Sequence, residues 1–154
     1  MTDYRIVGDI GIGGLGYVNA IVISRPNRIY SPIRFCVDTG CSVTIISHLD
    51  ALRIGLNYNS VQKSDQKSLN GVGDYIPYIL PATEILFTFE GTSLLEYVGD
   101  IHIMPPRSRL NNNNNNSGSS SQMSLLGIQI SLLGIDVLKK FTISFSQNNI
   151  ILGK

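Results

Sequence analysis

The chain has 154 residues, which suits a single domain spanning 1–154 and leaves little room for two. With 43% hydrophobic and 15% charged residues it can bury a core, which excludes an intrinsically disordered chain. The formal net charge of +1 gives no general attraction to nucleic acid or anionic lipid. No stretch reaches the roughly 18 consecutive apolar residues that cross a bilayer. We therefore expect neither nucleic acid nor a membrane as a partner.

The N-terminal residues and the cysteines indicate a cellular compartment. The first six residues include an acid and contain no apolar run of the kind that begins a secretory signal. Cys36 and Cys41 are too few for a disulfide framework and lack the paired spacing of a zinc site. We expect a cytoplasmic protein with reduced thiols, no metal and no cofactor.

Most of the sequence predicts short strands. From 17 to 23 the chain has a period of two, in which Val18, Ala20 and Val22 alternate with Tyr17, Asn19, Ile21 and Ile23, and Pro26 ends that run. Other short runs rich in β-branched or aromatic residues are separated by turn-forming Gly, Asn, Ser or Pro. These runs lie at 4–10, 33–38, 43–46, 84–89, 94–104, 141–145 and 149–152. Gln147-Asn148-Asn149, between the last two, predicts a tight hairpin.

A glycine-rich stretch, Gly11-Ile12-Gly13-Gly14-Leu15-Gly16, matches the G-x-G-x-x-G pattern of dinucleotide-binding proteins. That pattern requires a helix to follow, because the helix N-terminus binds the pyrophosphate. Here an alternating β run follows instead. We interpret the stretch as a hairpin loop.

Two short helices interrupt the strands. Ser47 is placed to cap the first, with Asp50 three residues on and Gly55 at its end. We expect its leucines to share one side: Leu49, Leu52 and Leu56. The second helix, about 135–140, directs Ile135 and Leu138 inward and ends on two lysines. An all-β fold with one or two short helices is therefore predicted. The Asn- and Ser-rich stretch at about 108–122 is low in complexity and predicts a surface loop inserted in the domain.

Asp38 stands between two apolar strands, in the segment Phe35-Cys36-Val37-Asp38-Thr39-Gly40-Cys41-Ser42. An ionised carboxylate there is costly unless it is paired, hydrogen-bonded or protonated. Thr39 adds a hydroxyl, and Gly40 lets the backbone approach the acid. These three residues alone also fit an ordinary turn between strands.

Two further motifs follow this segment along the chain. They are Gly71-Val72-Gly73 and Leu132-Leu133-Gly134-Ile135-Asp136-Val137-Leu138. Taken together with Val37-Asp38-Thr39-Gly40-Cys41-Ser42, they resemble the retropepsin-like aspartic proteases: the first motif is similar to the family's active-site loop, the second to its glycine-rich flap, and the third to the paired apolar residues and glycine that open a short helix. The three motifs follow the family's order, and the resemblance extends from about Tyr17 to Gly153.

The resemblance implies a closed acid-protease barrel with a single lobe per chain and aspartic endopeptidase activity on peptides. The chain has one Asp-Thr-Gly, so a protease needs a homodimer in which each subunit brings Asp38 to a two-fold axis. Gly71, Val72 and Gly73 are then the substrate-binding flap. Cleft-lining candidates are Ile76, Leu133 and Ile135.

The sequence departs from the family pattern at two positions. Cys41 stands where the family usually has Ala or Ser, and its small side chain fits there. Ile135 replaces an arginine common in the retroviral enzymes, which removes that residue's salt bridges. Asp136 is left to pair with a neighbouring cation or simply to begin the helix.

The sequence is also compatible with parts of two other functions, a hydrolase triad and a catalytically silent module. Ser42 or Cys41 with His48 and Asp50 supplies the residue types of a hydrolase triad, but the segment lacks the second glycine of a nucleophile elbow. His102, in an alternating apolar run, fits a structural or surface histidine. The remaining rival is a catalytically silent retropepsin-like module for dimerisation or peptide binding, because fold does not fix function.

Overall fold

The structure, a computed structural model, describes residues 4–64, 77–105 and 130–154. The strands are β1 (Arg5–Ile10), β2 (Gly16–Ser24), β3 (Ile29–Val37), β4 (Ile45–Ile46), β5 (Gln62–Lys63), β6 (Tyr78–Phe89), β7 (Thr92–Ile103), β8 (Ser131–Leu133), β9 (Thr142–Phe145) and β10 (Asn149–Gly153). The helices are α1 (His48–Arg53), α3 (Ile135–Leu138) and the 3-10 turns η1 (Ile12–Gly14) and η2 (Tyr58–Ser60). Within these residues no helix is long and apolar enough to cross a bilayer.

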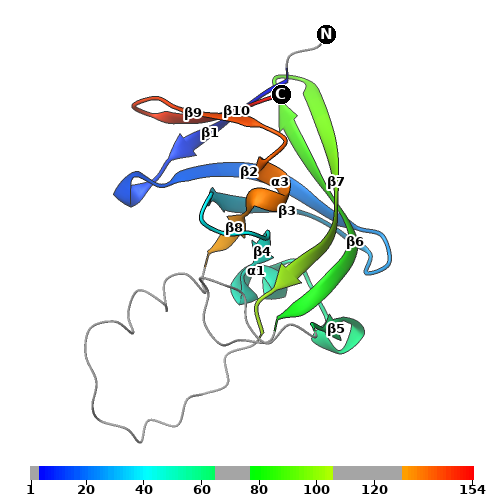
Figure 1. Cartoon of the computed structure of the whole chain (residues 1–154). Coiled ribbons are helices and arrows are strands. Elements are labelled where there is room, and N and C mark those ends of the chain that lie inside the picture. The colour runs from blue at the N-terminus through cyan, green and yellow to red at the C-terminus, as the bar shows by residue number, and fades with distance from the viewer. Residues whose placement is uncertain (1–3, 65–76, 106–129) are drawn as a thin grey trace, which may run out of the picture.

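The strands form a closed barrel. In order of pairing they run β5-β6-β7-β4-β8-β3-β2-β1-β10-β9, and β6 pairs with β2 as well as with β7. That extra pairing closes a ring of β2, β3, β8, β4, β7 and β6. Strands β1, β10 and β9 continue from β2 at one end of the barrel (Figure 1). The predicted all-β barrel is confirmed.

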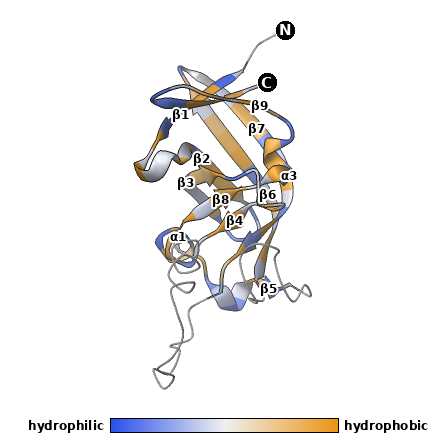
Figure 2. Ribbon diagram, turned by 60° about the vertical axis from the view of Figure 1, so that its left-hand side comes forward, coloured by the Kyte–Doolittle hydropathy of each residue, from blue (hydrophilic) through white to orange (hydrophobic). Residues whose placement is uncertain are grey.

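The barrel encloses the main hydrophobic core. Along β2, residues Val18, Ala20 and Val22 point inward, and their neighbours point outward. The inward residues of the other barrel strands join them, and the hydrophobic segments of β3, β6, β7 and β8 lie around one interior (Figure 2). A second, smaller cluster of Cys41, Ile45 and Met104 packs with Val43 and Leu132 beside the loop that follows β3. This cluster supports the loop that carries Asp38.

An ion cluster around Glu96 joins β7 to Lys140, just after the end of α3, and to Lys154, the residue after β10. The Glu96 carboxylate is buried and accepts hydrogen bonds from Lys140 Nζ at 2.9 Å and from Lys154 Nζ. Burial alone raises the pKa of Glu96, but the bonds from the two lysines outweigh it and the pKa lies below its usual value. The cluster thereby fixes the β9–β10 end of the chain to the barrel wall.

All the predicted strands are present, with shifted ends. The glycine-rich stretch is a hairpin loop between β1 and β2, where Gly11 N–H donates to Leu15 O at 2.8 Å. The hairpin between β9 and β10 is also confirmed. The sequence did not predict β5, β8 or the first halves of β3 and β6, which contain Pro32 and Pro81. Pro32 lies where β3 has no paired strand on its β8 side among the described residues, and Pro81 lies at a bulge in β6.

The side-chain orientations predicted for the two helices were partly wrong. Ser47 caps α1 as expected, its Oγ accepting from Asp50 N–H at 3.1 Å. Leu49 and Leu52 are exposed, however, whereas Leu56 is buried, so the three leucines do not share one side. The small Ala51 is the α1 side chain that packs inward. In α3, Val137 and Leu138 are buried and Ile135 is 39% exposed. A helix of one or two turns carries too few apolar positions for spacing to define its inward face.

Candidate active site

Asp38 is positioned by a strand that lies between the two ends of its loop. β8 pairs in parallel with β3 over Phe35–Val37 and in antiparallel with β4 at Ile45. Residues 38–44, called here the Asp38 loop, therefore pass over the end of β8. The first residue of the loop is fixed to that strand, because Asp38 N–H donates to Leu133 O at 3.1 Å. Asp38 is thus held at the end of a paired strand.

The three predicted catalytic residues lie together in this loop. Asp38 Oδ1 accepts a hydrogen bond from Gly40 N–H at 2.9 Å, and Asp38 O accepts one from Cys41 N–H at 3.3 Å. A Cβ added to Gly40 would lie 3.2 Å from Asp38 Oδ1, so glycine gives the backbone room beside the acid. Asp38 is half-buried, whereas Thr39 and Gly40 are exposed. The carboxylate is therefore anchored on one oxygen and remains open to solvent.

Asp136 fixes the far end of the Asp38 loop. Its carboxylate accepts from Thr44 Oγ1 at 2.7 Å and from Thr44 N–H at 2.9 Å, and it also accepts from Val137 N–H at 2.9 Å. Thr44 Oγ1 in turn accepts from Gly134 N–H at 3.0 Å. No lysine or arginine of the described ranges pairs with Asp136, so it begins the helix and binds Thr44. Thr44 could not be predicted as a site residue, because its only signal in the sequence is a hydroxyl between apolar residues.

The middle of the loop is tied to α3 through its backbone. Ile135 N–H donates to Cys41 O at 2.9 Å, and Asp136 N–H donates to Ser42 O at 3.3 Å. A Cβ on Gly134 would lie 2.4 Å from both the carbonyl carbon and the oxygen of Val43. Glycine is required at 134 because the two segments approach each other this closely.

The cysteines on either side of Asp38 are poor nucleophiles. Both are free and buried. Burial raises the pKa of each thiol above its ordinary value, and the negative charge of Asp38 raises it further. The thiolate form is therefore rare near neutral pH, which argues against a cysteine nucleophile.

His48 and Asp50 are occupied by structural contacts. His48 Nδ1 lies 2.8 Å from Tyr58 Oη, which donates to Met104 O, and burial raises the pKa of Tyr58 to about 12. Asp50 accepts from Ser131 Oγ at 2.6 Å and pairs with Arg53 at 3.0 Å. These partners support setting the hydrolase triad aside.

Exposed apolar side chains lie at the same end of the barrel as Asp38. Tyr17 pairs with Cys36, so Leu15, two residues earlier, comes opposite Asp38 at the ends of β2 and β3. Leu15 is exposed, and Ile12 at the tip of the same hairpin loop is 99% exposed. Ile135 adds a third partly exposed apolar side chain next to Cys41.

The predicted cleft and flap residues differ in outcome. Leu133 is fully buried in the main core, so its proposed place in a substrate cleft was wrong. Ile135 remains available to line one. Gly71, Val72, Gly73 and Ile76 lie outside the described residues, as does the predicted loop at 108–122.

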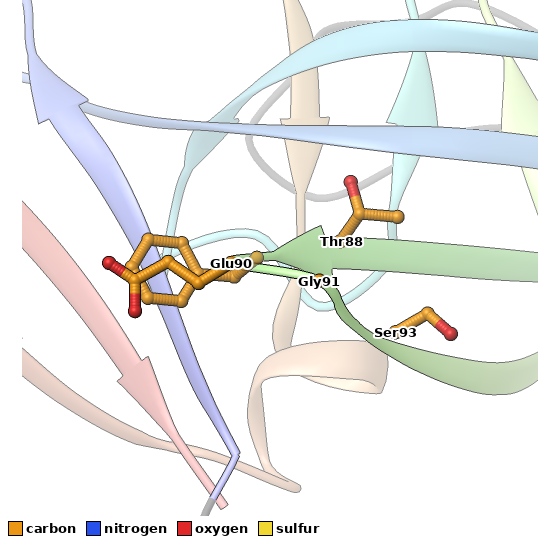
Figure 3. A pocket seen from close by; sticks show the side chains of 5 residues that line it. Thr88, Glu90, Gly91 and Ser93 are labelled. Atoms are coloured by element: carbon orange, nitrogen blue, oxygen red, sulfur yellow. The ribbon is translucent and has the colours of Figure 1, made fainter.

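A pocket of about 330 Å³ lies elsewhere, at the turn between β6 and β7 (Figure 3). It is lined by Thr88, Phe89, Glu90, Gly91 and Ser93. β7 contacts β4 at its opposite end, through His102 and Ile103. The pocket is therefore separated from the Asp38 loop by the length of β7.

The closed six-stranded barrel, with β8 lying between β3 and β4, defines a retropepsin-like fold. The chain is similar to the crystal structure of a retropepsin-like aspartic protease from Rickettsia conorii, with a TM-score of 0.55 and 21% sequence identity. The match covers 99% of this chain and 92% of that one. No family model matches the sequence, and no curated protein matches it.

Proposed function

We propose that this chain is an aspartic endopeptidase that works as a homodimer, with Asp38 of each subunit as the catalytic acid. The observation that carries the proposal is the Asp38 loop: a half-buried carboxylate, bonded to Gly40 N–H and fixed at both ends, on a retropepsin-like fold. Hydrogen bonds that fix the loop at both ends hold the reacting carboxylate in position before the reaction begins. Peptides or proteins are the proposed substrates.

In the proposed mechanism two Asp38 carboxylates meet at the two-fold axis. Carboxylates about 3 Å apart cannot both be ionised, so the pair shares one proton. The ionised partner acts as general base on a water molecule between them, and that water attacks the scissile carbonyl. The protonated partner polarises the carbonyl oxygen, and a proton then passes to the leaving amine. Gly71, Val72 and Gly73 are proposed to cover the bound peptide as a flap.

The second candidate is the catalytically silent module for dimerisation or peptide binding. The intact Asp38-Thr39-Gly40 sequence favours the enzyme, because a binding module has no need for an anchored, solvent-accessible carboxylate. The enzyme and the silent module predict different binding of an inhibitor that imitates the tetrahedral intermediate.

Binding stoichiometry tests the proposal. A peptide analogue with a hydroxyl in place of the scissile carbonyl is expected to bind once per two chains, because one inhibitor occupies one pair of Asp38 residues. Isothermal titration calorimetry measures the ratio, and a peptide with an unmodified backbone is the control, expected to bind at least about 100-fold more weakly. One analogue per chain, or equal binding of the two peptides, would argue for the silent module.

A dimer that joins two Asp38 residues must also cover the exposed side chains beside them. Burying one isoleucine side chain contributes about 1.5–3 kcal/mol. Ile12→Lys places a charge in that contact, so we expect the dimer dissociation constant to rise at least about tenfold. Sedimentation equilibrium measures the constant, and circular dichroism checks that the β fold is retained.

Leu95→Lys is the matched control for this change. Leu95 is also exposed, but it lies near the start of β7, opposite Leu86 of β6 and at the other end of β7 from β4. Leu95→Lys should leave the dimer dissociation constant unchanged. If both variants dimerise as the wild type does, the subunits do not meet at the Asp38 end of the barrel.

A further inference from the structure

His102 is a buried histidine that the proposed reaction does not use. It lies in β7 and is 9% exposed, and its Nδ1 is buried with no hydrogen-bond partner among the described residues. A buried polar atom without a partner costs free energy, and native structures contain few of them. The position of this imidazole therefore needs a physical reason.

His102 lies directly behind the Asp38 loop. Ile101 and Ile103 point into the main core, so His102 points to the other face of β7. Ile45, its partner in β4, lies on that face and belongs to the small cluster with Cys41. The backbone makes the contact direct, because His102 N–H donates to Thr44 O at 3.2 Å. Thr44 therefore touches His102 through its carbonyl and Asp136 through its amide and hydroxyl.

Two carboxylates act on this imidazole: Asp136 from α3 and Asp100 from β7 itself. The residues paired with His102 on β4 and β6, Ile45 and Ile79, are uncharged. Burial lowers the pKa of His102 below its ordinary value of 6.5, and the two carboxylates only partly oppose that effect. His102 is accordingly neutral at neutral pH.

We propose that neutral His102 is a positioning residue for the Asp38 loop, and that its protonation loosens the hydrogen bonds between Thr44 and Asp136. An imidazolium carries a proton on Nδ1, which has no acceptor among the residues that the structure describes. Asp136 is the carboxylate that acts on it from another element, and its oxygens already accept from Thr44 and Val137. A charged His102 either stays without an acceptor or draws Asp136 away from Thr44. The inference does not depend on peptide cleavage.

The direction of the pH effect follows from linkage. Because the pKa of folded His102 lies below 6.5, the loosened loop binds more protons than the closed loop just below that pH. The loop is therefore fully stabilised above about pH 6.5 and loses stability as the pH falls from there to the folded pKa. Each unit of difference between the two pKa values corresponds to a tenfold change in the opening equilibrium.

Amide exchange of the full chain measures this opening. The amides of Thr44 and Gly134 report it, since they donate to Asp136 and to Thr44 Oγ1. Their protection factors, corrected for intrinsic exchange, should fall up to tenfold per pH unit below about 6.5, while those of the β2 amides fall less. In His102→Gln the fall should disappear. The chain has two histidines, so His48→Gln is the matched control and should behave as the wild type.

A proton titration of the His102 ring is the second measurement, and it needs no change at position 102. NMR of the ring Cε1–H is expected to give a midpoint below 6.5, and a still lower midpoint in Asp136→Asn, which removes a charge that raises the pKa of His102. A midpoint at or above 6.5, or one that Asp136→Asn does not move, overturns the proposal. The proposal is also overturned if the protection of the Thr44 and Gly134 amides still falls at acid pH in His102→Gln.

Discussion

Replacing Asp38 by Asn is expected to abolish peptide cleavage and to leave the fold and the dimer intact. Asn keeps the shape of the side chain, and its carbonyl oxygen still accepts from Gly40 N–H, which bonds Asp38 Oδ1 at 2.9 Å in the wild type. It cannot act as a general base or share a proton across the dyad. General acid–base groups contribute about 10²–10⁴-fold, so we expect kcat to fall by at least about 100-fold.

The same variant tests whether each active site uses two subunits. Wild-type chains mixed with a tenfold excess of Asp38→Asn chains, and allowed to exchange subunits, would leave only about one tenth of the wild-type chains in wild-type dimers. Activity should drop in that proportion, because a mixed dimer has one carboxylate. Excess Thr142→Ala chains, changed at an exposed position of the outer strand β9, serve as the control and should cause no loss. Activity that depends only on the amount of wild-type chain would mean that one Asp38 suffices, and the dimeric mechanism would be wrong.

The parts of the fold that sequence could predict are those with a local signal. Alternation from Tyr17 to Ile23 identified β2 because every second residue points into the core. The glycine-rich stretch could be distinguished from a dinucleotide-binding motif because β2, and not a helix, follows it. Ser47 was identified as a cap from the acid three residues later. In each case neighbouring residues determine the structure.

The parts that sequence could not predict depend on distant segments. β8 has three residues, too few for a period, and it is a strand because β3 and β4 lie on either side of it. The orientation of α1 depends on a distant strand in the same way: Ala51 packs into the core, and Arg53 of the same helix donates to Pro32 O of β3 at 2.8 Å. The bond from Thr44 to Asp136 joins residues 92 positions apart. Asp38 was recognisable from its own motif, but the contacts that position it were not.

The Asp38 loop and α3 form one structural unit, and this explains why the third sequence motif accompanies the first. The first motif supplies the acid, and the third supplies the strand β8 and the turn that fixes the loop at both ends. Asp38 N–H is bonded to Leu133 O, and Thr44 is bonded to Asp136. A change in the 133–137 segment is therefore expected to act on the position of Asp38.

Gly134→Ala should be the most destabilising single-methyl substitution at the site. The new Cβ would lie 2.4 Å from the backbone carbon and oxygen of Val43, and a backbone group cannot rotate away as a side chain does. Relief requires the Asp38 loop to move, which breaks the bonds from Ile135 N–H to Cys41 O and from Gly134 N–H to Thr44 Oγ1. Overpacking costs about 1–3 kcal/mol and occasionally more, and we expect about 3 kcal/mol here, measured by urea unfolding.

Gly153→Ala is the control for this change, since among the described residues its new Cβ would meet Thr142 O alone, at 3.9 Å. It should alter the free energy of unfolding by less than about 1 kcal/mol, in either direction. Any Gly134→Ala protein that still folds should show weakened protection of the Thr44 amide and reduced kcat, because the displaced loop no longer fixes Asp38. A Gly134→Ala protein as stable as Gly153→Ala would mean that the two segments do not approach as closely as described. The link between the third motif and the position of the acid would then be lost.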